Sequence, residues 1–393
     1  MQRTHVVKRG LVVLLGFGLW GCGAEPASGP APLGEFASPV IKGYAELVYA
    51  AYQDASAGAD ALDSSVVSLT SEPTELSLGS ARSAWIASRV PYGLTEVFRF
   101  YGGPIDDADG PEGRINPWPM DEAYVDYVEG APNAGIINDP SAVPILDEAT
   151  LSALNEKDGE KNIASGYHAI EFLLWGQDKD PKGPGQRPFT DYVEGPNGTA
   201  ANQSRRGDFL RAASALLRSD LHSVEAEWAP ETGAYRGVWL SLPPEVAIGN
   251  MLKGMGSLSG AELAGERMQV AYDTKEQEDE HSCFSDNTLK DLLANARGIE
   301  DVYLGRHGSL DVPGLDEIVR TRDVQLDGRM QADLSAAIAA LSAIEGNFDQ
   351  AILGSDDAKG RKQMAEAIQA LRKVTLTIVE IADVLGIKLN VEE

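Results

Sequence analysis

The chain has 393 residues, of which 43% are apolar, and 33 basic against 60 acidic side chains give it a formal net charge of −27. This length and composition allow a sizeable core and exceed one small domain. Nucleic-acid binding depends largely on Lys and Arg side chains that neutralise phosphates, so the acidic surplus argues against a DNA or RNA partner. The sequence also lacks the Gly-rich motifs that bind nucleotide phosphates. Metal-binding, carbohydrate-binding and structural proteins remain.

The first 21 residues have the pattern of an export signal. Basic residues precede a short apolar run, which is too short to span a membrane as a mature helix. The run ends in Leu-Trp-Gly-Cys, which resembles a bacterial lipobox and predicts lipidation of Cys22. We therefore expect an exported cell-envelope protein, attached to the outer membrane by its lipid anchor only. Ordinary signal cleavage, with Cys22 left as a free thiol, is the alternative.

The chain after Cys22 divides into a tether and a helical body. Residues 22–39 are rich in Pro, Ala, Gly and Ser and predict a flexible tether. Apolar residues then recur at three- and four-residue spacing, which predicts an all-α fold of antiparallel helical bundles. A polar stretch near the middle separates two predicted bundles, residues 40–190 and 191–393. The predicted helices span residues 40–69, 74–101, 121–128, 147–154, 161–176, 200–228, 244–272, 288–304, 323–353 and 357–385.

Polar side chains interrupt the apolar pattern first in the predicted helix 74–101. They recur at 4-3-4-3 spacing and so form one stripe beside an apolar stripe. Charged side chains at the edge of a core-facing surface need partners, because burying an isolated charge is costly. The stripe therefore lines a site or, alternatively, forms an internal ladder of ion pairs. It comprises Trp85, Arg89, Tyr92, Glu96 and Arg99.

A histidine and a glutamate stand out in the next apolar helix. His168 and Glu171 are one turn apart on the same face, so both can reach one ion. The same His-x-x-Glu spacing recurs at His222 in a polar pattern, so the spacing alone is weak evidence. Burying the pair in an apolar helix requires a reason, which is either a ligand or an internal ion pair. Gly166 and Trp175 flank the pair.

The third polar region is the segment of residues 276–288, called here the late segment. It combines several carboxylates with one imidazole, a ligand set that suits a ferrous, ferric or zinc ion through His281 or Asp286. Helix capping by Asp286 or Asn287 and a solvated helix end are the alternatives. The further residues expected to line the site are Glu278, Glu280, Ser285 and Asn287.

Together these segments resemble the imelysin-like family of exported bacterial proteins, which is also classed as a peptidase family. The Gly-x-His-x-x-Glu motif of that family is matched by Gly166, His168 and Glu171, and residues 85–106 and 280–288 resemble its early helix and its late motif. The resemblance implies a duplicated helical-bundle fold, a polar site near the interface of the halves, and an association with bacterial iron uptake.

Four functions remain open. The first is a non-enzymatic lipoprotein that binds iron, zinc or another divalent ion, or an iron-containing ligand, for uptake together with a periplasmic or outer-membrane partner. The second, a metallopeptidase, lacks the His-Glu-x-x-His pattern of zincins. A ferritin-like di-iron oxidase needs two Glu-x-x-His pairs, and one is present. The fourth is a metal-free module that binds a basic partner. The metal ligands expected for the first function are His168, Glu171, Glu96, His281 and Asp286.

Overall fold

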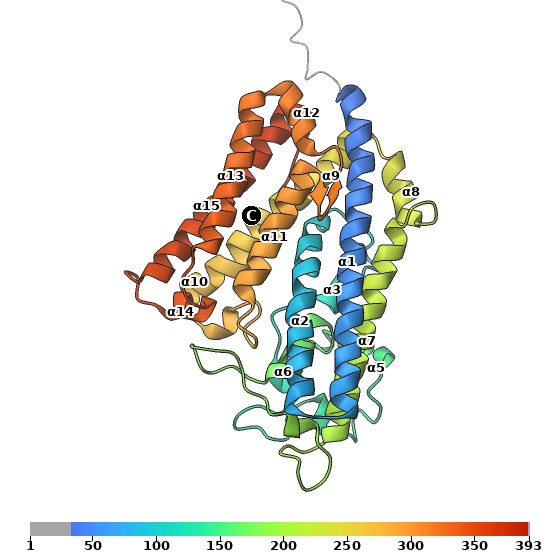
Figure 1. Cartoon of the computed structure of the whole chain (residues 1–393), viewed down its shortest axis with the longest axis vertical. Coiled ribbons are helices and arrows are strands. Elements are labelled where there is room, and N and C mark those ends of the chain that lie inside the picture. Colours follow the sequence, from blue (N-terminus) through green and yellow to red (C-terminus); the bar gives the residue numbers. More distant parts are fainter. Residues whose placement is uncertain (1–32, 392–393) are drawn as a thin grey trace, which may run out of the picture.

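The computed structural model describes residues 33–391 and consists almost entirely of helices (Figure 1). Helix accounts for 66% of the structure, which confirms the predicted all-α class. One antiparallel hairpin is formed by β1 (Arg306–His307) and β2 (Leu310–Asp311), and a π-helix, η5 (Leu258–Gln269), joins α9 to α10. The α-helices are α1 (Ala37–Ser71), α2 (Glu75–Thr95), α3 (Glu112–Ile115), α4 (Glu122–Val125), α5 (Glu148–Leu154), α6 (Gly166–Trp175), α7 (Gln203–Trp228), α8 (Ala234–Ser241), α9 (Pro244–Ser257), α10 (Val270–Thr274), α11 (Thr288–Leu304), α12 (Leu315–Arg322), α13 (Val324–Ser342), α14 (Phe348–Leu353) and α15 (Lys359–Leu385).

Part of the predicted N-terminal organisation falls within the described residues. The predicted export signal and the first part of the tether, residues 1–32 with Cys22, lie outside them. Residues 33–39, the end of the predicted tether, form a 3-10 turn, η1 (Gly34–Phe36), and the start of α1. The helical body therefore begins earlier than predicted. In the described part of the chain, no helix is both long and apolar enough to cross a membrane.

The helices form two groups that lie side by side (Figure 1). In the first group, α1, α2, α6 and α7 pack together, and α9, η5, α11, α13 and α15 make up the second. The apolar periodicity explains this packing, since residues such as Val48, Tyr52 and Ala55 of α1 are buried at helical spacing. The predicted division between residues 190 and 191 stays a prediction; α7, which follows it, packs against α1 and α6.

The two groups meet where α2 packs against α11, and two glycines allow a close approach. A Cβ atom on Gly93 would lie 2.7 Å from the Cβ atom of Ala294, and one on Gly298 would lie 2.6 Å from the carbonyl oxygen of Leu94. Larger side chains at these positions would push the helices apart. This contact brings the polar stripe of α2 to the N-terminal turns of α11, where the site is found.

Most predicted helices are confirmed, and the exceptions have local causes. The predicted helix 74–101 ends early because Phe100 has a φ of 76°, and α2 passes into a 3-10 turn, η2 (Glu96–Phe98). The predicted helix 323–353 is broken between α13 and α14, where Gly346 has a φ of 84°. The short helices α3, α8 and α12 have no predicted counterpart, since each buries one to three residues, too few for a periodic pattern.

Candidate functional site

The predicted pair on α6 lies in the core. All ten residues of α6 are buried, and His168 Nδ1 lies 3.0 Å from Glu171 Oε2. The other oxygen of Glu171, Oε1, accepts hydrogen bonds from the backbone N–H and the hydroxyl of Ser285, at 2.9 and 2.6 Å. Ser285 belongs to the late segment, so the two predicted regions meet at this carboxyl. Both oxygens of Glu171 are thereby engaged by protein groups.

The first glycine of the motif has a structural task. Gly166 begins α6 with a φ of 79°, and a Cβ atom there would lie 2.5 Å from the carbonyl oxygen of Ile115. A side chain would therefore clash with backbone and would also be strained. The close approach holds the first residue of α6 against the end of α3, which Asn116 follows directly. Gly166 thus positions the helix that carries His168.

The late segment brings a second imidazole to the first. The rings of His168 and His281 have their centroids 4.6 Å apart at an interplanar angle of 77°, and Trp118 packs on His281 at 5.5 Å. Both imidazoles are buried, and His168 Nε2 and His281 Nδ1 have no hydrogen-bond partner. Asp291 Oδ2 lies 3.8 Å from His281 Nδ1, which is too long for a hydrogen bond. Such buried nitrogens are costly unless a ligand satisfies them.

Burial keeps both imidazoles neutral near pH 7. It lowers the pKa of His168 well below the ordinary histidine value, and the nearby His281 and Arg89 lower it further. Burial, followed by the charge of Arg267, lowers the pKa of His281 to about 4. Burial also raises the pKa of Glu171 to about 8, although the hydrogen bonds from Ser285 oppose this shift. Neutral imidazole is the form that binds metal ions.

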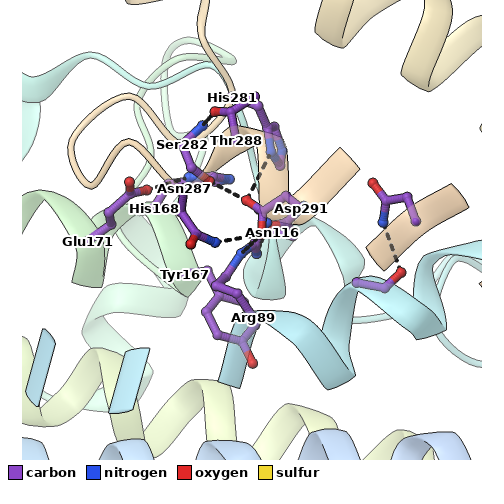
Figure 2. Close-up of polar contacts among 12 residues, drawn as sticks. Arg89, Asn116, Tyr167, His168, Glu171, His281, Ser282, Asn287, Thr288 and Asp291 are labelled. Atoms are coloured by element: carbon purple, nitrogen blue, oxygen red, sulfur yellow. Dashed lines mark hydrogen bonds and ion pairs between the residues drawn. The ribbon is translucent and has the colours of Figure 1, made fainter. Parts of the chain in front are cut away.

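A buried ion pair between Arg89 and Asp291 lies next to the imidazoles (Figure 2). Arg89 Nε and Nη2 each donate to Asp291 at 3.1 Å, and Nη1 donates to Asn116 at 2.6 Å. Asp291 also accepts hydrogen bonds from the side chains of Ser282 and Asn287. Although burial opposes its charge, Arg89 lowers the pKa of Asp291 to about 2. Asp291 therefore anchors the late segment to α2, a role that the sequence analysis missed.

The rest of the α2 stripe forms the internal network that was the predicted alternative. Glu96 accepts hydrogen bonds from Arg267 at 2.7 and 3.0 Å and from Asn295 at 2.7 Å. Arg99 adds an ion pair at 3.3 Å. Burial opposes the charge of Glu96, but Arg267 holds its pKa well below the ordinary value. Both oxygens of Glu96 are thus occupied by protein donors, and Asn116 links this network to Arg89.

The other predicted residues fall into three places. Three aromatic side chains pack behind α6, where Trp85 Nε1 donates to the carbonyl oxygen of Tyr167 at 2.9 Å. These are Trp85, Tyr92 and Trp175, and their rings pack on Tyr167 or on one another. Glu278 is exposed at the rim of a pocket. Asp286 and Glu280 lie in a separate group of carboxylates and are not joined to the imidazoles by any hydrogen bond within residues 33–391.

Two pockets meet at His281 and Trp118, which line both. One pocket has a volume of about 320 Å³ and the other of about 240 Å³. Although His281 is itself buried, a small molecule or ion can approach its ring from either pocket. The larger pocket is lined by Trp118, Met120, Asp121, Glu122, Ala123, Val128, Lys161, Gln177, Glu278, His281, Cys283 and Phe284.

Comparisons with known proteins match most of the chain. The family model described as Imelysin matches residues 48–378. Iron-regulated protein A of Synechococcus elongatus is 25% identical over 319 residues, which are 77% of this chain and 75% of that protein. A putative iron-regulated protein A precursor from Parabacteroides distasonis has a similar structure, with a TM-score of 0.69, 19% identity and coverage of 93% of this chain and 97% of its own. An imelysin-like protein from Psychrobacter arcticum has a TM-score of 0.65, with 14% identity and coverage of 93% and 100%. These structures confirm the fold.

Proposed function

The chain belongs to the imelysin family, and from this premise we propose that it binds a transition-metal ion between His168 and His281. The observation that carries the proposal is the pair of buried imidazoles, each with a ring nitrogen that has no partner. Imidazole nitrogens suit iron, zinc, copper and nickel. The two nitrogens belong to different segments of the chain, so an ion between them would join α6 to the late segment.

Glu171 supports this proposal from behind His168. A histidine that binds a metal usually donates its other ring N–H to a carboxylate or carbonyl, which fixes the tautomer. When Glu171 is ionised, Nδ1 of His168 carries the hydrogen and the lone pair is on Nε2, which has no hydrogen-bond partner. Metal binding at Nε2 would therefore release the proton that the raised pKa of Glu171 retains in the metal-free protein. We therefore assign Glu171 the task of orienting His168. The two imidazoles are the protein ligands, and water or an iron-containing ligand would complete the coordination.

The geometry favours binding over catalysis. An open catalytic zinc site usually has three protein ligands and one water. The carboxylate beside His281 is Asp291, and its oxygens already accept hydrogen bonds from Arg89, Ser282 and Asn287. Two imidazoles without a third free protein ligand are better suited to hold an ion than to activate water. We accordingly propose a non-enzymatic protein.

The names of two relatives favour iron among the metals. Both are called iron-regulated protein A, one as a putative precursor. We propose that this chain binds iron, or an iron-containing ligand, in bacterial iron uptake. Its export and anchoring through Cys22, together with an uptake partner in the cell envelope, belong to the same proposal. The pockets on either side of His281 provide space for such a ligand.

The test is an anaerobic titration of chelator-treated protein with ferrous iron, followed by calorimetry. His168→Ala and His281→Ala should each weaken binding at least tenfold, because each removes one of two protein ligands. His222→Ala is the matched control, since His222 forms the same pair with Glu225 on an exposed face. Titration curves of His168→Ala that match those of His222→Ala would remove the assignment.

A further inference from the structure

A second group of ligand atoms lies outside the imidazole site. Asp178, Asp286 and Asp349 each offer one carboxylate oxygen, and these oxygens all lie within 4.8 Å of one another. The three residues come from distant segments, namely the loop after α6, the late segment and the first turn of α14. Two of them are partly exposed and Asp349 is buried, so the group is open to solvent on one side.

A buried fourth carboxylate points to a ligand in this group. Glu280 is fully buried, and neither of its carboxyl oxygens has a hydrogen-bond partner. Its carboxyl group interacts directly with that of Asp349, whose Oδ1 is also buried without a partner. One oxygen of Asp286 is unpartnered as well. Buried carboxylate oxygens without donors are costly, so these carboxyls need a bound cation or protons.

No basic side chain supplies that charge. Within residues 33–391, the groups that act most strongly on the four carboxyls are other carboxyls and neutral side-chain or backbone groups, with no Lys, Arg or His among them. Their protein donors are neutral amides. Gln277 Nε2 donates to Asp178 at 2.8 Å and to Asp349 at 3.0 Å, and Asn347 Nδ2 donates to Asp286 at 2.9 Å.

A matched region of the same protein shows the usual solution. Asp126 is equally buried, and there Arg187 and Arg206 donate to its two oxygens at 2.7 to 2.9 Å. Glu96 and Asp291, which are also buried, are likewise paired with guanidinium groups, those of Arg267 and Arg89. The group around Asp349 departs from that pattern.

We propose that Asp178, Asp286 and Asp349 bind a calcium ion, with Glu280 beside Asp349; the four residues are called here the acidic cluster. All four offer hard oxygen atoms, which Ca²⁺ takes in sets of about six to eight, several of them carboxylates. Mg²⁺ in proteins usually keeps several waters and uses one or two carboxylates, so three converging carboxylates with a fourth beside them favour Ca²⁺. The proposal is independent of the imidazole site, whose nitrogen ligands suit transition metals.

The ion would act as a clamp between distant segments. It would tie the loop that follows α6 and the start of α14 to the late segment, which also carries His281 and Ser285. Binding would thus lower the free energy of the folded state, because the ion removes the repulsion among four carboxylates that the fold has already brought together. Calcium should raise the thermal midpoint of the protein.

The experiment is a calorimetric titration of the purified, EDTA-treated full chain with Ca²⁺, and in parallel with Mg²⁺. One Ca²⁺ should bind per chain, and Asp349→Asn and the more exposed Asp178→Asn should each weaken binding at least tenfold. Asp311→Asn is the control, because it removes one charge from an exposed aspartate outside the cluster. Circular dichroism of each variant establishes that it is folded.

Three results would overturn the proposal. They are the absence of binding at millimolar Ca²⁺, Mg²⁺ binding as tight as Ca²⁺ binding, and equal Ca²⁺ affinity in Asp178→Asn, Asp311→Asn and the unmodified chain. A thermal midpoint that rises on acidification and does not respond to Ca²⁺ would overturn it as well, because protons would then neutralise the cluster. Ca²⁺ titration of His168→Ala separates the two sites: unchanged Ca²⁺ binding together with lost iron binding is expected. Ca²⁺ binding without iron binding in the unmodified chain would refute the proposed function alone.

Discussion

Two histidine–glutamate pairs share their spacing and local geometry but differ in burial and in the partner of the second ring nitrogen. His168 on α6 and His222 on α7 each place Nδ1 near the glutamate three residues later, at 3.0 and 3.2 Å. His222 Nε2 has a partner, Asp60, at 3.1 Å, and the pair is partly exposed. His168 Nε2 has none and is buried. The spacing sets the local geometry, whereas burial and the state of the second nitrogen distinguish a candidate ligand from a surface ion pair.

The ion pairs next to the two histidines should differ most in their contribution to stability. Arg89→Ala leaves the buried charge of Asp291 without its partner and should cost about 3–5 kcal/mol. Arg218→Ala removes the exposed partner of Asp60, and its effect should be too small to resolve. Urea unfolding near pH 7 measures both. If Arg89→Ala lowered the free energy of unfolding as little as Arg218→Ala does, the Arg89–Asp291 ion pair would not have the stabilising role assigned to it.

The glutamates of the two pairs should differ in their effect on the pH dependence of stability. The folded-state pKa of Glu171 is raised from an ordinary value of 4.5 to about 8. Between these two pKa values the folded protein holds a proton that the unfolded chain releases. The contribution of Glu171 to the free energy of unfolding is therefore complete below about pH 4.5 and is lost as the pH rises through 8.

Between about pH 5 and pH 8 the free energy of unfolding of chelator-treated protein should fall by on the order of 3 kcal/mol on account of Glu171. Glu171→Gln removes this fall, because glutamine does not titrate. Glu225→Gln, the change at the second pair, should retain it. Urea unfolding curves between pH 5 and pH 8 measure this fall in each variant. An unchanged fall in Glu171→Gln would show that the carboxyl group of Glu171 does not cause it.

The helices that carry the two histidines should respond differently to an added methyl group. Gly166→Ala should destabilise the protein by about 2 kcal/mol, since it meets backbone atoms of Ile115 and has an unfavourable φ. A methyl group in Gly207→Ala on α7 would make ordinary contacts with Thr70 and Arg211, so this change should be neutral or stabilising by up to about 1 kcal/mol. Thermal unfolding compares them. Equal midpoints would mean that α6 tolerates a side chain at its first residue.

Helical spacing in the sequence predicted the all-α class. A shared polar site was implied by the family resemblance alone, and the structure brings His168, Glu171, His281 and Ser285 together. Asp291 was missed because an acidic residue in the first turn of a helix is common for dipole reasons alone. Its role depends on Arg89, which is about 200 residues away in the chain and meets it only because α2 packs on α11.

The position of Asp286 shows a second limit of sequence reasoning. It was expected beside the imidazoles as one of the oxygen ligands of the late segment, and its neighbour Ser285 does contact Glu171. Its φ of 56° turns the backbone at this point, and the side chain reaches Asp178 and Asp349. Neighbours in an irregular segment need not share a face, and only the three-dimensional structure shows which way each side chain points.

The most direct measurement is anomalous diffraction at the iron edge from crystals of the protein loaded with ferrous iron without oxygen. One strong peak is expected between His168 Nε2 and His281 Nδ1. A peak confined to the acidic cluster or to His222, with no density between the two buried rings, would contradict it.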